Sequence, residues 1–169
     1  MSEKVKYELE FVVKSSSSLL YKYISTPGGL GEWFADNVNS RGEIFTFIWN
    51  GDEEQAKLLT KKVNQFVRFK WLADEDPETY FELKIQIDDL TKDVALIITD
   101  FAEEDELEES RLLWESQVGD LHGLIGGSFH FCSSSIIIRS IRSLMASSSF
   151  SFGAYRTFKS APYNFPTPW

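Results

Sequence analysis

The sequence has little cysteine, and its basic residues are outnumbered by its acidic ones. Cys132 is the only cysteine, which excludes a framework of internal disulfide bonds. The chain has 17 Lys and Arg residues against 26 Asp and Glu residues, and its net charge is −9. A protein that grips nucleic acid phosphates needs a basic face, so we expect no nucleic-acid partner.

Long apolar runs are also missing. No run reaches the roughly 18 residues of a membrane-spanning helix, so we expect no membrane span. The first residues lack the basic-then-apolar pattern of a signal peptide, and we therefore expect a cytoplasmic location.

The motifs that carry cofactors, metals or nucleophilic catalysis are absent as well. His122, His130 and Cys132 do not have the spacing of a zinc site. The glycines of 28–31 match neither a phosphate-binding loop nor a dinucleotide-binding motif, and there is no Gly-x-Ser-x-Gly of a serine hydrolase. The acidic run 103–109 lacks the ligand spacing of a calcium loop, and we interpret it as a solvated helix start. We expect no cofactor and no bound metal.

The acidic residues are confined to the first part of the chain, the last of them being Asp120. The residues after Asp120 hold eleven serines and the basic residues Arg139, Arg142, Arg156 and Lys159. This change of composition predicts a folded domain over residues 1–126 and a Ser-rich tail over 127–169. Three interpretations of the tail stay open: a disordered interaction arm, an additional packed element, or a sequence shifted out of its natural reading frame.

The first 126 residues show a clear periodicity of polar and apolar side chains. Residues 4–14 alternate between polar and apolar side chains, which predicts a half-buried strand. Serines 15–18, and then Thr26 with Pro27, are typical starts of two short helices. Further alternating runs predict strands at 44–49, 54–62, 67–71, 81–87 and 94–99, with a hairpin turn at Asn50–Gly51. Consecutive hairpins of this kind form an antiparallel meander.

A long amphipathic helix is predicted over residues 105–125. Its apolar face is formed by Leu107, Trp114, Val118, Leu121 and Ile125. Arg111 is the one polar residue that we expect to interrupt this face, with its stem lying along apolar surface.

One segment carries a family resemblance. Residues 25–36 read Ser-Thr-Pro-Gly-Gly-Leu-Gly-Glu-Trp-Phe-Ala-Asp, and Phe45–Trp49 form a Phe-x-Phe-x-Trp pattern. With the order of elements, these residues resemble the START-like (SRPBCC, helix-grip) superfamily, in the branch of the heat-shock chaperone ATPase activator homologues. The resemblance covers residues 1 to about 126. It implies an α+β helix-grip fold, in which a curved antiparallel sheet of about seven strands wraps around the long C-terminal helix, with two short helices between strands 1 and 2. The space between sheet and helix in such folds often encloses an apolar molecule.

The aromatic residues, 15% of the chain, are the candidate site. They fall on separate elements that face one interior, where they would either fill a core or line a ligand cavity. The candidate ligand-binding residues are Trp33, Phe34, Phe47, Trp49, Phe69, Trp71, Phe81, Ile85, Ile98, Trp114 and Val118.

Three functions remain as hypotheses. The first is non-enzymatic binding of a small apolar or lipid-like ligand in this interior. The second, implied by the resemblance, is a co-chaperone-like module whose partner is a chaperone or another protein. The third is a cyclase- or hydrolase-like enzyme that uses cavity acids, for which Asp36 and Asp100 are the candidates. We interpret both aspartates as turn or capping residues. We expect Arg68 and Lys70 to face solvent, with Glu82 and the neighbours of Lys84 as candidate cross-strand partners.

Overall fold

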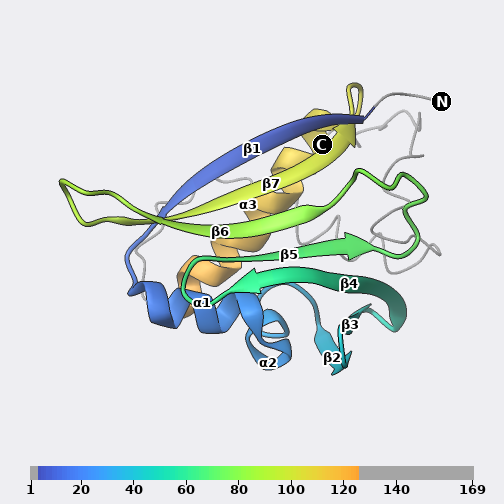
Figure 1. The fold of residues 1–169 in the computed structure, drawn as a ribbon, viewed down its shortest axis with the longest axis horizontal. Coiled ribbons are helices and arrows are strands. Elements are labelled where there is room, and N and C mark those ends of the chain that lie inside the picture. The colour runs from blue at the N-terminus through green and yellow to red at the C-terminus, as the bar shows by residue number, and fades with distance from the viewer. Residues whose placement is uncertain (1–3, 126–169) are drawn as a thin grey trace, which may run out of the picture.

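Seven strands and three helices make up residues 4–125, which are the residues that the computed structural model describes (Figure 1). In chain order they are β1 (Lys4–Val13), α1 (Ser17–Ser25), α2 (Pro27–Leu30), β2 (Asn37–Arg41), β3 (Ile44–Trp49), β4 (Asp52–Lys62), β5 (Phe66–Trp71), β6 (Phe81–Ile87), β7 (Val94–Glu103) and α3 (Leu107–Leu124). The predicted α+β order is confirmed. The predicted tail, 127–169, lies outside the described residues.

All seven strands form one antiparallel sheet in the order β1-β7-β6-β5-β4-β3-β2. The first strand pairs with the last along its whole length, with Lys4 opposite Glu103 and Val13 opposite Val94. The sheet is curved and α3 crosses one of its faces (Figure 1), while α1 contacts β5 and β6 and α2 contacts β2. This is the helix-grip arrangement expected from the sequence.

The two short helices begin at hydroxyl caps, as predicted. Ser16 Oγ accepts the backbone N–H of Leu19 at 3.2 Å, and Thr26 Oγ1 accepts that of Gly29 at 3.0 Å. The Thr26 hydroxyl also donates to the carbonyl of Lys22 at 2.8 Å, so one side chain joins the end of α1 to the start of α2.

The predicted strands differ from the observed ones mainly at their ends. The turn between β3 and β4 has positive φ at Asn50 and Gly51, as the hairpin prediction requires. The prediction that the last strand stops at Thr99 was wrong, because β7 continues to Glu103. Asp100 therefore lies within a strand, not in a turn or cap.

The predicted apolar face of α3 points to the sheet. Trp114, Val118 and Leu121 are buried in the middle of α3, and Ile125 is buried directly after it. The expectation that Arg111 is the one polar residue on this face was wrong. Arg111 is exposed, whereas Gln117 is buried among the apolar residues.

Candidate functional site

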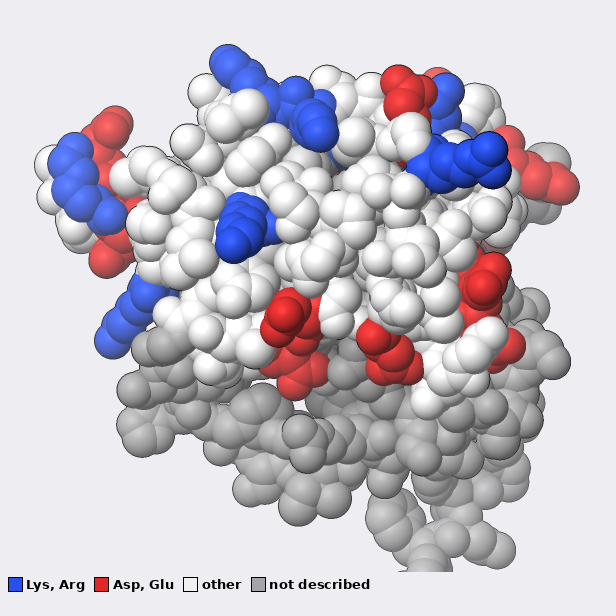
Figure 2. Space-filling view, turned by 90° about the horizontal axis from the view of Figure 1, so that it is seen from below, with Lys and Arg blue, Asp and Glu red and all other residues white. Residues whose placement is uncertain are grey.

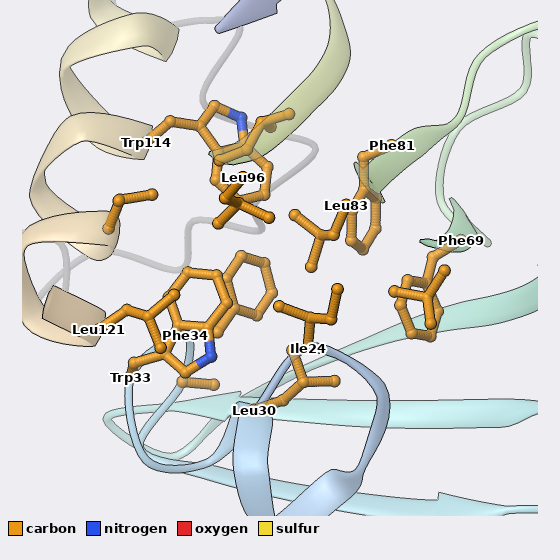
Figure 3. Close-up of a cluster of buried hydrophobic side chains, with 14 of the residues drawn as sticks. Ile24, Leu30, Trp33, Phe34, Phe69, Phe81, Leu83, Leu96, Trp114 and Leu121 are labelled. Carbon is orange, nitrogen blue, oxygen red and sulfur yellow. The ribbon is translucent and has the colours of Figure 1, made fainter. Parts of the chain in front are cut away.

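The candidate ligand-binding residues converge on the space between the sheet and α3. Except for Trp49, which is half-buried, all of them are buried. Figure 3 shows Trp33, Phe34, Phe81 and Trp114 reaching this space from three directions: the segment after α2, strand β6 and helix α3. For the strand residues of the set, such as Phe81, the alternation therefore identified the buried face of the sheet.

Phe34 lies at the centre of this aromatic interior. Its ring stacks on that of Trp114, with centroids 5.4 Å apart, and meets the ring of Phe47 edge-on at 5.1 Å. Further contacts join Phe69 to Phe81 at 5.1 Å and Phe34 to Phe81 at 6.0 Å. Ring contacts thus run continuously from α3 through the segment after α2 to β3, β5 and β6.

The backbone carbonyl of Phe34 is a second meeting point. It accepts the indole N–H of Trp49 at 2.9 Å and the side-chain amide N–H of Gln117 at 3.2 Å. The indole of Trp33 is satisfied in the same way, by donating to the carbonyl of Tyr23 at 3.1 Å. The polar atoms of these large side chains are therefore held by backbone carbonyls of α1 and of the segment after α2, which fixes the positions of the rings.

A buried carboxylate lies at one margin of the interior. Asp100 Oδ2 accepts the indole N–H of Trp114 at 2.9 Å and the hydroxyl of Tyr7 at 3.4 Å, while Oδ1 accepts the backbone N–H of Phe101 at 2.8 Å. The Tyr7 hydroxyl is also 2.5 Å from Ser110 Oγ on α3. Asp100 and its partners therefore fasten α3 to β7 and β1.

Burial controls the protonation of this group. It raises the pKa of Asp100 from 3.8 to about 6, although the hydrogen bonds from Trp114, Phe101 and Tyr7 favour the ionised form. Burial, followed by the negative charge of Asp100, raises the pKa of Tyr7 as well. A sequence signal for Asp100 did exist: Trp114 was predicted to face inward, and Tyr7 is an apolar-face position of the alternating strand 4–14. Each of the two side chains carries a donor that needs an acceptor when buried.

The other polar predictions have mixed outcomes. Asp36 is exposed and accepts the backbone N–H of Asn50 at 2.7 Å, which confirms its role in a turn. Arg68 and Lys70 are half-buried rather than solvent-facing, and the candidate cross-strand partner Glu82 is confirmed for Arg68. Arg68 pairs across the strands with Glu82 at 2.7 Å, and Lys70 donates to backbone carbonyls, that of Thr79 at 3.4 Å.

Within residues 4–125, His, Cys, Asp and Glu side chains do not gather in groups of three that could hold a metal ion. His122 is buried on α3, and burial lowers its pKa. His130 and Cys132 lie outside the described residues. Within the same range, α3 and the shorter helices lack the length and hydropathy needed to cross a membrane.

The charges on one face are dispersed. Figure 2 looks at the molecule from below relative to Figure 1, toward the side of α1 and α2. Its Lys, Arg, Asp and Glu side chains stand apart around a largely uncharged centre. In the described part of this face, charge is therefore not gathered into one patch.

Comparison with known proteins agrees with this architecture. A protein from Bacteroides fragilis, BfR322, has a solution NMR structure that matches with 40% sequence identity and a TM-score of 0.55, over 78% of this chain and 98% of that one. The Aha1 dimer from Colwellia psychrerythraea matches at 19% identity and a TM-score of 0.61, over 74% and 99% of the two chains. CalU16 from Micromonospora echinospora matches at 13% identity and a TM-score of 0.57, over 87% and 99%.

At these identities, the last two likenesses concern the fold alone. None of the curated proteins matches the sequence. Residues 1–127 match the START-like superfamily domain, and the chain therefore belongs to the START-like superfamily.

Proposed function

We propose that this domain binds a small apolar ligand, without catalysis, between the sheet and α3. The observation that carries the proposal is the convergence of buried aromatic side chains from the segment after α2, from β3, β5 and β6, and from α3 on one interior. Aromatic walls with a few polar groups are typical of small-molecule sites. The START-like superfamily, whose fold commonly binds ligands or proteins, supports the same function.

Access to this interior requires rings to separate. Phe34 contacts α3 through Trp114 and the sheet through Phe47, so a ligand between them exchanges ring–ring contacts for ring–ligand contacts. Trp49 is the half-buried member of the set, and its ring lies 5.8 Å from that of Phe34. We propose that the ligand enters beside Trp49, where the aromatic interior comes nearest to the surface.

The test uses N-phenyl-1-naphthylamine, an uncharged apolar fluorophore. Saturable binding with energy transfer from tryptophan is the expected result. Val118→Phe, which adds bulk to the buried face of α3, should weaken binding about tenfold or more. Leu112→Phe is the matched control on the exposed face of the same helix and should leave the affinity unchanged.

A second buried variant checks that weaker binding by Val118→Phe is not simply the result of misfolding. Phe81→Leu removes ring volume from the interior and should bind the probe at least as tightly as the wild type. Circular dichroism verifies that each variant is folded. Absence of saturable binding to the wild-type protein would overturn the proposal.

Salt dependence separates this function from a co-chaperone-like one. Enclosure by apolar side chains is insensitive to ionic strength, whereas docking of a protein on charged surface weakens as salt screens it. On the described part of the face in Figure 2, charges are not gathered into a single docking patch for such a partner. A cytoplasmic location remains part of the proposal, and cell fractionation tests it.

A further inference from the structure

Gln117 is a polar residue within the apolar face of α3. It lies one turn from both Trp114 and Leu121, and its exposed fraction is only 3%. Glutamine is rarely buried to this extent, and a buried amide is normally hydrogen-bonded at both ends.

The orientation of the Gln117 amide follows from its partner. The carbonyl oxygen of Phe34 can only accept, so the group 3.2 Å from it must be the Nε2 donor of Gln117. The same carbonyl also accepts from Trp49, which occupies its second lone pair. The amide is thereby anchored beside the central ring of the aromatic interior, with Oε1 at its other end.

Oε1 of Gln117 is fully buried and has no hydrogen-bond partner among residues 4–125. A buried acceptor without a partner costs about 1–3 kcal/mol. Asp100, the buried carboxylate at the margin of the same interior, differs because it accepts three hydrogen bonds. The open acceptor at Gln117 therefore offers a binding position for a donor that is brought into the interior.

We infer that Gln117 Oε1 accepts a hydrogen bond from a hydroxyl or N–H group of the ligand. The site then selects a flat apolar molecule that carries one donor over an equal-sized molecule that carries none. The rings of Phe34 and Trp114, stacked at 5.4 Å, contact the apolar body, and Gln117 fixes its polar end. This inference rests on the proposed function and adds the chemical class of the ligand.

Three naphthalenes of similar size test the inference on the wild-type protein. 1-Naphthol has a donor, 1-methoxynaphthalene has only an acceptor, and 1-methylnaphthalene has neither. We expect 1-naphthol to bind about tenfold more tightly than either of the others, the effect of one buried hydrogen bond. Tryptophan quenching measures the three affinities.

Two glutamine-to-methionine variants test whether the preference for 1-naphthol depends on Gln117. Gln117→Met keeps the length of the side chain and removes the acceptor, so it should abolish the preference for 1-naphthol while 1-methylnaphthalene still binds. Gln86→Met makes the same change at an exposed site on β6 and should keep the preference.

The possible outcomes are distinct. If the wild-type protein binds none of the three probes, the proposed function fails. If it binds all three with equal affinity, or if Gln117→Met keeps the preference, the function stands and the role of Gln117 is overturned. The wild-type comparison decides the matter even if Gln117→Met does not fold.

Discussion

At the scale of single residues, Asp100 connects stability to pH. Its carboxylate is buried and accepts hydrogen bonds from Trp114 and Tyr7, yet its pKa is raised to about 6 because burial penalises the charge. The folded protein therefore holds a proton on Asp100 at pH values where the unfolded chain has lost it.

This difference has a defined sign. Between the unfolded value of 3.8 and the folded value of about 6, the folded state binds more protons, so the contribution of Asp100 to stability falls as pH rises through this window. About two pKa units correspond to about 3 kcal/mol. Asp100→Asn does not titrate, so its unfolding free energy relative to wild type should improve by about that amount from pH 4 to pH 7. Urea unfolding at four pH values measures the difference, and a constant difference would contradict the prediction.

At the scale of elements, the close approach of α1 to α2 explains why position 29 is a glycine. A Cβ on Gly29 would lie 2.4 Å from the backbone oxygen of Lys22 and 2.7 Å from the Cα of Tyr23, whereas a Cβ on Gly28 would meet nothing within 4 Å. Sequence patterns do not distinguish Gly28 from Gly29, because either glycine weakens a helix. The difference arises only when the end of α1 is folded against α2.

The two glycines form a matched pair of substitutions. Gly29→Ala should destabilise the domain by about 2 kcal/mol or more, because backbone atoms must move to admit the methyl group. Gly28→Ala should be neutral or stabilising by up to about 1 kcal/mol, the gain in helix propensity. Thermal unfolding of both variants measures this, and equal effects would show that the contact is unimportant.

One acidic residue at the start of α3, Glu106, stabilises the helix less than its position at the N-terminus predicts. Glu106 is the N-cap but makes no side-chain capping bond, and it is half-buried. Burial, then the charges of Glu103, Asp105 and Glu109, raise its pKa to about 7. The predicted solvated helix start therefore holds only in part for Glu106, which is half-buried.

Replacing the Glu106 carboxylate with an amide tests that conclusion. Because the pKa of Glu106 is raised from 4.5 to about 7 in the folded protein, its contribution to stability falls as the pH rises through this window and stays low above it. Glu106→Gln should therefore stabilise the protein at pH 8, by less than about 1 kcal/mol because the group is partly exposed to solvent. The gain should vanish at pH 4, and a gain of the same size at both pH values would argue against a charge effect.

The strands show where sequence patterns succeed. β3 alternates with one face buried, as at Phe45 and Phe47, and its position was predictable. β2 is an edge strand with Val38 as its one buried residue, so no alternation marks it. The burial of Gln117 was not predicted for a related reason. Periodicity identifies the apolar residues on the buried face of a helix, but not a polar residue on the same face.

At the scale of the whole molecule, the domain boundary is a proposal that can be tested. The buried apolar residues of the described range lie between Tyr7 and Ile125, and the family match spans residues 1–127. Truncation after Gly127 should therefore change the melting temperature by less than about 2 °C, equivalent to a few tenths of a kcal/mol. A fall of many degrees, measured by scanning calorimetry, would show that the tail packs on the domain.

The pairing of β1 with β7 dictates the order in which the chain can complete its sheet during synthesis. Val13 pairs with Val94 and Lys4 pairs with Glu103. Strand β1, which is synthesised first, therefore has no partner strand until nearly the entire domain has left the ribosome. Contacts this distant in sequence slow folding, because a long loop must close before they form. A nascent chain halted before β7 would thus carry an unfinished sheet edge, the kind of surface on which chaperones act and aggregates grow.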